Sequence, residues 1–400
     1  MKILIITSRV PLPAESGYTI AVNNFVKGLY EANIDYTLLS INTSKHFVDT
    51  TKFDKIEYLK NRFFSAYIKT NINLCSAFFN LFSNKSYNIQ RFISKQYILT
   101  ITEILKNNQF DIIQIEGLYA STAINTIKKL SKAKIVFRAH NVEYLIWERM
   151  ANSQTNIIKK YYFKLLADRL KKYEKDFILN KTDLLITFSI NDLNEFINWG
   201  YENSFYINPI GIETKLYKTE KEKSKNLTLF YIASFDWMPN TEGLLWFAEN
   251  VWENIQKKYP NLHFIVGGRY MNKEINDLKN KGIDILGEVK DAIQFITQND
   301  IMIVPLLAGS GIRVKILEAM AAGKIVISTS IGAEGIQYSN LKNIIIADTP
   351  DEFLNAINKI IENNELFNLI SSNAEKLIYE QYSNQKVINK LIEKYKEVVK

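Results

Sequence analysis

Short runs of apolar, mostly β-branched residues alternate along the chain with longer segments of helical periodicity. In the first half, such runs predict strands at residues 2–8, 35–41, 111–116, 134–139, 183–188 and 204–208. In the second half, they predict strands at residues 227–233, 262–266, 283–287, 301–305, 324–328 and 343–347. Strands that alternate with helices are typical of parallel, doubly wound sheets. The pattern therefore predicts an α/β fold of two Rossmann-like domains, whose parallel sheets we expect to face one another across a cleft.

A charged stretch near the middle of the chain separates the two series of strands. Residues 215–225, KLYKTEKEKSK, carry no apolar periodicity and are typical of a linker. A length of 400 residues also suits two domains of about 200 residues each. We expect the first domain at residues 1–207, the linker at 208–226, the second domain at 227–380 and a final helix at 381–400.

The segment at residues 304–330 is the most informative of the chain. It joins a glycine-rich turn at 309–311 to a helix predicted at 312–322. Glycine lets the backbone approach a ligand, and the start of a helix offers unpaired N–H groups and the positive end of the helix dipole. These features and two cationic side chains predict a diphosphate site. The residues that we expect to form it are Gly309, Ser310, Gly311, Ile312, Arg313 and Lys315.

Glu318 lies about two turns further into the same predicted helix. A carboxylate at that depth, behind a phosphate site, is placed to accept hydrogen bonds from ribose hydroxyls. The alternative is a glutamate that faces solvent on a surface helix. Because Leu317, Ala319 and Met320 flank Glu318 in an otherwise apolar helix, we favour the ribose contact.

In the first half, two residues follow strands at the sheet edge where ligands of such folds bind. Gly17 comes after the first strand and before a helix predicted at 18–32, so that its backbone can approach a ligand; an ordinary turn glycine is the alternative. His140 directly follows the strand at 134–139. An imidazole can give or take a proton near neutral pH, so we expect His140 to act on a bound substrate; a structural histidine is the alternative.

Two adjacent glycines, Gly267 and Gly268, follow the strand predicted at 262–266, at the corresponding edge of the second sheet. Without a Cβ atom, they allow a nucleobase or ribose to pack closely against the backbone. Glycines required only by the local chain path are the alternative. We expect both residues to contribute to the binding of a nucleotide.

The segment at residues 58–97 mixes aromatic and basic side chains and contains no acidic residue. This composition suits anionic lipid headgroups or a lipid-diphosphate acceptor, and it predicts an acceptor or membrane face that includes Lys60, Arg62 and Lys69. The alternative is an amphipathic core helix with a basic outer side. A second basic run, which begins at Ile157, also resembles a long structural helix with solvated charges.

The net charge of +8 is compatible with nucleic acid, an anionic membrane or an anionic small substrate as partner. No zinc spacing, RNA-binding signature or helix-turn-helix pattern is present in the sequence, so we expect no nucleic acid partner. No carboxylate cluster has metal-ligand spacing, and we expect no metal. The single Cys75, the absence of a membrane-spanning run and a first strand without a preceding signal peptide predict a cytoplasmic protein.

The motifs LEAMAAGKIVIST, INPIGIETKLY, IVGGR and LGEVKD, together with KILIITSRVPLPAESG at the start, occur in an order that resembles glycosyltransferase family 4. The resemblance covers most of the chain. It implies the GT-B fold, with C-terminal helices that return to the first domain. It also implies a retaining, metal-independent transfer from a nucleoside diphosphate sugar bound by the second domain to an acceptor bound by the first. Glu288 and Val289 would then lie in the loop that reads the nucleobase.

The chain departs from the family pattern at two positions. Ser310 stands where the first glutamate of the family's Glu-x7-Glu motif is expected, and IASFDWMPNTEG lacks the usual arginine and lysine. A Gly-Ser-Gly-x-Arg turn with an Asp-Trp-x-Pro-Asn segment resembles a subgroup of the family. We expect Arg313 and Lys315 to replace the missing cations. Asp236, Trp237 and Asn240 would line the same place, although Trp237 is equally typical of a core residue.

These observations predict a cytoplasmic hexosyltransferase that acts in surface polysaccharide or glycoconjugate synthesis, with His140, Arg313, Lys315 and Glu318 as its catalytic residues. We expect no cofactor. Its partners would be a nucleotide-sugar donor, a glycan or lipid-linked acceptor and the inner-membrane surface. The alternative is a nucleotide-sugar-binding scaffold subunit without transferase activity, which the serine at 310 would favour. A dinucleotide oxidoreductase is excluded because no Gly-x-Gly-x-x-Gly turn follows the first strand.

Overall fold

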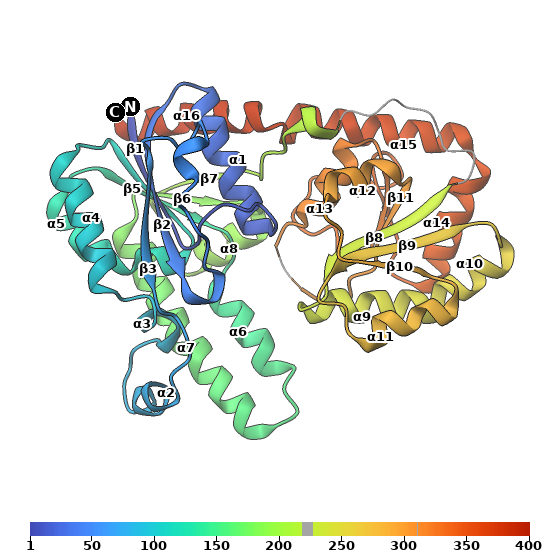
Figure 1. The fold of residues 1–400 in the computed structure, drawn as a ribbon, viewed down its shortest axis with the longest axis horizontal. Coiled ribbons are helices and arrows are strands. Elements are labelled where there is room, and N and C mark those ends of the chain that lie inside the picture. Colours follow the sequence, from blue (N-terminus) through green and yellow to red (C-terminus); the bar gives the residue numbers. More distant parts are fainter. Residues whose placement is uncertain (218–226, 310) are drawn as a thin grey trace. The chain divides into compact units, whose positions relative to one another are not determined.

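The computed structural model describes residues 1–217, 227–309 and 311–400. Contacts divide the chain into two units (Figure 1). The first consists of Met1–Pro209 and Val387–Lys400, and the second of Ile210–Lys386. Each unit is built around its own parallel sheet, so the expected α/β class with two Rossmann-like domains is confirmed.

The first sheet has seven strands in the order β3-β2-β1-β4-β5-β6-β7, and every pair is parallel. Six of these strands coincide with the runs expected in the first half. The strands are β1 (Lys2–Thr7), β2 (Asp35–Thr43), β3 (Phe63–Ile68), β4 (Ile112–Glu116), β5 (Lys134–Ala139), β6 (Leu184–Thr187) and β7 (Ser204–Ile207).

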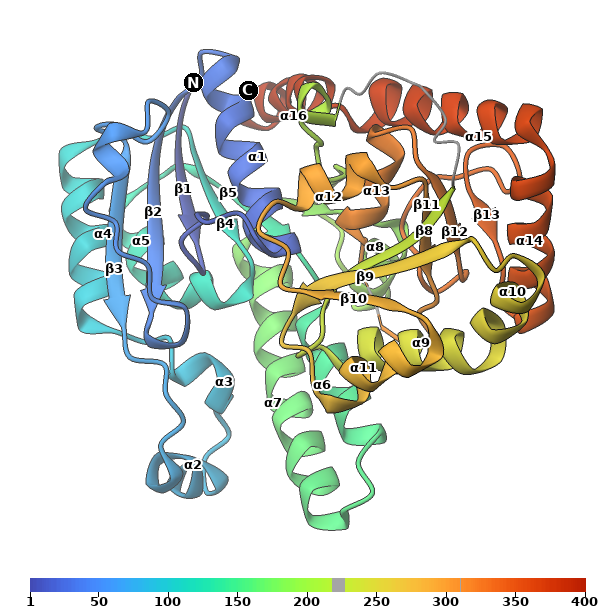
Figure 2. The same cartoon turned by 45° about the vertical axis from the view of Figure 1, so that its right-hand side comes forward.

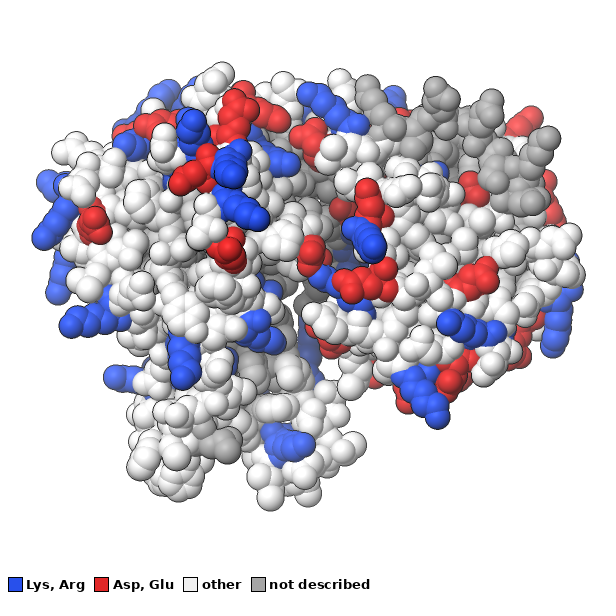
Figure 3. All heavy atoms as spheres, viewed as in Figure 1, with Lys and Arg blue, Asp and Glu red and all other residues white. Residues whose placement is uncertain are grey.

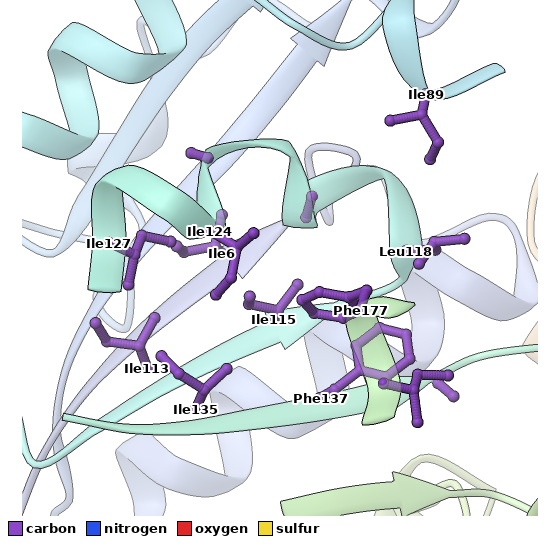
Figure 4. Close-up of a cluster of buried hydrophobic side chains, with 14 of the residues drawn as sticks. Ile6, Ile89, Ile113, Ile115, Leu118, Ile124, Ile127, Ile135, Phe137 and Phe177 are labelled. Atoms are coloured by element: carbon purple, nitrogen blue, oxygen red, sulfur yellow. The ribbon is translucent and has the colours of Figure 1, made fainter. Parts of the chain in front are cut away.

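Helices cover both faces of this sheet. One face packs against α1 and the C-terminal helix α16, and the other against α4, α5, α7 and α8. In Figure 4, Ile113 and Ile115 of β4 lie with Phe137 of β5 among the helix residues Ile127 and Phe177. The helices are α1 (Gly17–Glu31), α2 (Leu74–Leu81), α3 (Tyr87–Gln90), α4 (Lys95–Asn107), α5 (Ile124–Leu130), α6 (Glu143–Asn152), α7 (Ile157–Lys181), α8 (Ile190–Asn198) and α16 (Asn384–Val399).

The second sheet has the order β10-β9-β8-β11-β12-β13 and is also parallel throughout. All six strands coincide with the runs expected in the second half (Figure 2). They are β8 (Thr228–Ser234), β9 (His263–Arg269), β10 (Asp284–Gly287), β11 (Ile301–Val304), β12 (Ile325–Ser328) and β13 (Ile345–Ile346). The helices are α9 (Met238–Phe247), α10 (Glu253–Lys258), α11 (Lys273–Asp277), α12 (Ala292–Gln298), α13 (Val314–Ala321), α14 (Pro350–Glu362) and α15 (Asn364–Leu377).

The C-terminal helix returns to the first unit, as expected. Ile388, Leu391 and Tyr395 are fully buried or nearly so in the core that also contains β1 and α1. The phenol of Tyr395 donates to the side-chain oxygen of Gln114 in β4. The last helix therefore completes a core that the first half of the chain begins.

The unit boundaries differ from the expected ones at two places. The second unit begins at Ile210, because Ile210, Ile212 and Tyr217 are buried and Ile212 forms a β-bridge with Ser383. The first described part of the expected linker is therefore packed structure; its remainder, 218–226, lies outside the described residues. The chain re-enters the first unit at Val387 rather than at residue 381.

Candidate functional site

The second unit places Arg313 beside the glycine turn that follows β11. Arg313 is the N-cap residue of α13, and its guanidinium lies 5.0 Å from the ring centre of Trp237. Its Nη1 donates to the carbonyl of Gly311 at 2.7 Å. Gly309 has φ 121°, and a Cβ atom there would lie 2.6 Å from Nη2 of Arg313 and 2.7 Å from Trp237, so only glycine fits. Trp237 is 38% exposed and does not belong to the core.

Lys315 enters the same region from the first turn of α13. Its Nζ donates to the carbonyl of Ile232 at 3.2 Å and to Oδ1 of Asn240 at 3.4 Å, and it lies 4.2 Å from the ring centre of Tyr231. Burial, and then the nearby charge of Arg313, lower the pKa of Lys315 to about 7. The structure thus brings together three of the residues expected near a diphosphate, namely Arg313, Lys315 and Asn240.

Helix α13 begins at Val314, two residues later than expected, so Ile312 belongs to the turn rather than to the helix. Ser310, which stands in the place of the family glutamate, lies outside the described residues. Glu318 is half-buried, and its Oε1 accepts a hydrogen bond from the phenol of Tyr217 at 2.8 Å. Burial raises the pKa of Glu318, and the bond from Tyr217 partly offsets that rise. Glu318 is therefore not a fully solvated surface carboxylate.

The adjacent glycines of β9 have structural reasons to be glycine. Gly268 has φ 153°, and a Cβ atom there would lie 1.8 Å from the carbonyl oxygen of Ala233 in the neighbouring strand. At Gly267, a Cβ atom would lie 2.4 Å from the side chain of Val289. Both positions are therefore accounted for by packing between strands and loops. Val289 is half-buried against Gly267, whereas the neighbouring Glu288 is exposed.

In the first unit, a buried polar cluster lies at the carboxyl ends of β4 and β5. Glu116 and Arg138 are direct neighbours in the register of the two strands, and Arg138 Nη1 lies 3.3 Å from Glu116 Oε1. His140, two residues beyond Arg138, lies on the same face, with Nε2 2.6 Å from Glu116 Oε2. Gln114 also donates to Glu116 Oε1. The ring of Tyr18 lies 4.4 Å from that of His140.

Burial and the neighbouring charges together define the protonation of His140. Burial alone would raise the pKa of the Glu116 carboxyl, but Arg138 and His140 outweigh it and lower that pKa, so Glu116 is ionised at neutral pH. Burial lowers the pKa of His140 despite its bond to Glu116, so the ring is neutral. A neutral ring beside a carboxylate carries its proton on Nε2 and donates it to Glu116. Nδ1 then keeps its lone pair and can accept a hydrogen bond.

Glu116 belongs to this cluster, but the sequence did not predict it as a site residue. The sequence does contain a pattern that indicates such a cluster. Gln114 and Glu116 alternate with apolar residues along β4, and Arg138 and His140 alternate with apolar residues along and just after β5. Polar residues at a spacing of two within a buried strand share one face of the sheet. They only become a cluster, however, through the register of β4 on β5.

The remaining candidates of the first unit lie at the start of α1 and on either side of β3. Gly17 is the first residue of α1, with Ser16 as N-cap, so it belongs to a helix rather than to a loop. Lys60 and Arg62 precede β3 and Lys69 follows it, so these residues lie beyond opposite ends of the strand. The guanidinium of Arg62 lies over the rings of Tyr30 and Tyr36.

The alternative interpretation of residues 58–97, an amphipathic core helix, is partly wrong, because residues 63–68 form β3 at the edge of the first sheet. Two kinds of feature are absent from the described residues. They contain no group of three or more His, Cys, Asp or Glu side chains that could hold a metal ion. None of their helices is long and apolar enough to cross a membrane.

Comparison with known proteins gives matches for the second unit and for the whole chain. Residues 226–363 match the family described as Glycosyl transferases group 1. An uncharacterized 44.6 kDa protein in the cps region of Klebsiella pneumoniae is 25% identical over 98% of both chains. An uncharacterized glycosyltransferase of Methanocaldococcus jannaschii, MJ1069, is 30% identical over 30% of this chain and 31% of its own.

Among solved structures, Anabaena Alr3699/HepE in complex with UDP is similar over 99% of this chain and 100% of its own, with a TM-score of 0.70 and 14% identity. A likeness at this identity concerns the fold. Together with the two parallel-sheet units, it places the chain in the GT-B fold class. The chain therefore has a GT-B fold whose second unit matches glycosyl transferases group 1, and these findings support a glycosyltransferase.

Proposed function

We propose that this chain is a retaining glycosyltransferase of family 4. It transfers a hexosyl group from a nucleoside diphosphate sugar to a glycan or lipid-linked acceptor in surface polysaccharide or glycoconjugate synthesis. The observation that carries the proposal is the cationic start of α13, where Arg313 and Lys315 meet behind the turn at Gly309. The match of residues 226–363, the UDP in the HepE complex and the cps region of the Klebsiella relative support it.

Arg313, Lys315 and the start of α13 would bind the donor diphosphate. Two cations and the positive end of a helix dipole stabilise the negative charge that grows on the diphosphate as it departs. Because these groups supply the counter-charge, the transfer that we propose needs no divalent metal. Glu318 would accept hydrogen bonds from the ribose hydroxyls, and the loop at Glu288 and Val289 would contact the base.

The proposed reaction replaces one bond at the anomeric carbon by another on the same face of the sugar. The bond from that carbon to the diphosphate oxygen breaks, and a bond to the acceptor oxygen forms. The acceptor hydroxyl gives its proton to an oxygen of the departing diphosphate. This displacement uses no nucleophile of the enzyme, so the protein contributes alignment and charge stabilisation.

His140 would orient a substrate hydroxyl through Nδ1, with Glu116 as its positioning residue. His140→Ala should lower turnover by about 10- to 1,000-fold and leave nucleotide affinity almost unchanged, because it removes a hydrogen-bond acceptor and not a diphosphate contact. His263→Ala is the matched control, since His263 is exposed and pairs with Asp284. Turnover of the wild-type level in His140→Ala would contradict the role.

We further propose that the protein works in the cytoplasm at the inner-membrane surface, where a lipid-linked acceptor would be available. The basic, aromatic composition of residues 58–97 supports this location. The association needs no spanning helix, because a peripheral surface is sufficient.

The decisive experiment measures UDP binding by calorimetry and hydrolysis of UDP-glucose and UDP-N-acetylglucosamine. Arg313→Ala should weaken UDP binding by about ten- to a hundredfold, because it removes a charge-assisted contact worth about 1.5 to 3 kcal/mol. Lys279→Ala, an exposed lysine of the same unit, should bind as the wild type does. A wild-type protein that binds no nucleoside diphosphate would overturn the proposal. Tight binding without hydrolysis or transfer would favour the scaffold subunit.

A further inference from the structure

The first unit exposes a group of large apolar side chains that belong to neither site described above. They belong to two segments: α2 with its flanking residues, and the start of α7 where it follows the turn from α6. We name this group the apolar tip. It consists of Ile72, Phe78, Phe79, Phe82, Ile157, Ile158 and Tyr161, each between 58% and 81% exposed.

The two segments project from the same side of the first unit. Both views show α2 and the joined ends of α6 and α7 extending beyond the sheet in one direction (Figures 1 and 2). Arg169 of α7 connects them, since Nη1 donates to the carbonyl of Asn80 at 2.9 Å and Nη2 to that of Leu81 at 3.0 Å. The last carbonyls of α2 are thereby held by α7, so the end of α2 is anchored to the helix whose start carries the other exposed residues.

Within the apolar tip, aromatic rings contact one another, and a hydrogen bond joins α6 to α7. The ring of Phe78 lies 6.0 Å from that of Phe79 and 5.5 Å from that of Phe82, so the rings contact one another instead of being buried. The α6–α7 pair is fixed by a bond of 2.7 Å from Lys164 to Glu148. A contiguous group of aromatic rings exposed to solvent is unfavourable in water alone, and it indicates a partner.

Cations are interleaved with the apolar residues. Lys159 and Lys160 directly follow Ile157 and Ile158, and Lys85 follows α2; all three lysines are exposed. No acidic residue occurs in the sequence between Glu57 and Glu103. In Figure 3 this projection is largely white with blue spheres. The tip therefore combines apolar surface with positive charge.

We propose that the apolar tip docks the first unit onto an anionic lipid bilayer. Aromatic rings lie at the depth of lipid headgroups, and lysines beside them attract anionic lipids. Lysine is depleted in the buried centre of protein interfaces, whereas here a lysine pair adjoins the most exposed apolar residues, and this favours lipid over protein. This inference identifies the residues that would contact the membrane. It rests only on the part of the proposed function that locates the protein at the inner-membrane surface.

The test is sedimentation of the full chain with vesicles of phosphatidylglycerol and phosphatidylcholine in equal amounts, and with vesicles of phosphatidylcholine only. The wild type should bind the anionic vesicles more strongly. Lys159→Gln with Lys160→Gln should weaken that binding by roughly 25-fold. Phe78→Ser with Phe79→Ser should weaken it by about 100-fold or more.

The matched control for charge is Lys128→Gln with Lys129→Gln, an adjacent exposed pair in the last turn of α5, which should bind vesicles as the wild type does. Every variant should keep the wild-type affinity for UDP. Absence of vesicle binding by the wild type, or full binding by the double phenylalanine variant, would overturn the inference. So would light scattering that shows the phenylalanine variant to break an oligomer, since the tip would then bind a second copy. A wild type that binds vesicles but no UDP would overturn the proposed function and leave this inference standing.

Discussion

Lys315 is half-buried beside Arg313 and the ring of Tyr231, and its pKa of about 7 means that it is largely neutral at pH 8 without a ligand. A bound diphosphate would favour the charged ammonium and raise that pKa. UDP binding at pH 8 should therefore take up close to one proton, whereas at pH 6 it should take up almost none from this group. Calorimetry in buffers of different ionisation enthalpy measures this uptake. Lys315→Met should abolish it, and uptake that persists in this variant would assign the proton to another group.

The carboxylate of Glu318 accepts a hydrogen bond from Tyr217, so Glu318 either binds ribose or only anchors Tyr217. A pair of substitutions distinguishes these two roles. If Glu318 binds ribose, Glu318→Gln should weaken UDP binding by about tenfold, and Tyr217→Phe should leave the binding nearly unchanged. If Glu318 only anchors Tyr217, both variants should lose similar thermal stability and retain UDP binding. Calorimetry and thermal unfolding of the two proteins, side by side, give the answer.

At the scale of elements, the start of α6 has an unusual cap. Its N-cap residue, Val142, offers no side-chain oxygen, and the two carboxyl oxygens of Glu174 in α7 accept from the backbone N–H groups of Glu143 and Tyr144 at 2.9 and 3.1 Å. Glu174 is completely buried. Burial, and then the neighbouring Glu143, raise its pKa to about 8. The cap thus couples the α6–α7 pair to pH.

The sign of this coupling follows from the raised pKa. Between pH 4.5, the ordinary value, and pH 8 the folded protein binds the proton of Glu174 more tightly than the unfolded chain does. Its contribution to stability is complete below that window and is lost as pH rises through it, by at most about 1.4 kcal/mol per pH unit. The difference in unfolding free energy between wild type and Glu174→Gln should therefore fall from pH 6 to pH 8.5. Asp168→Asn, an exposed position of α7, should show no such trend.

At the scale of the whole molecule, the last helix stabilises the unit that contains the first strand. Leu391 of α16 is fully buried in the core that includes Ile3 and Val22. Leu391→Ala should cost about 2 to 5 kcal/mol. Hydrogen exchange should accelerate in β1 and α1 and remain unchanged in β8 and β9. Leu369→Ala, which is exposed in α15, is the control, and faster exchange in β8 and β9 of the Leu391 variant would contradict the division into two units.

The sequence by itself determined the strands and the class of fold. Each apolar run named in advance coincides with a strand, because a strand buried on both faces needs such a run whatever its neighbours are. The glycine turn and the cationic side chains at 313 and 315 could also be predicted from the sequence. A turn, a helix start and side chains a few residues apart stay together in any fold. The edge strand β3 was missed because FFSAYI leaves Phe64 and Tyr67 exposed and carries no uniform apolar signal.

Only the tertiary structure determined the contacts between segments that are far apart in the sequence. Glu116 meets Arg138 and His140 only through strand register, and Gly268 must be glycine only because the carbonyl of Ala233 lies against it. Tyr217 reaches Glu318 across 101 positions, and Tyr395 reaches Gln114 across 281. A local pattern records burial and periodicity, whereas such contacts depend on which elements pack together. The sequence therefore identified the chemistry at α13, while the partners that set the protonation of His140, Glu174 and Glu318 came from the packing of the chain.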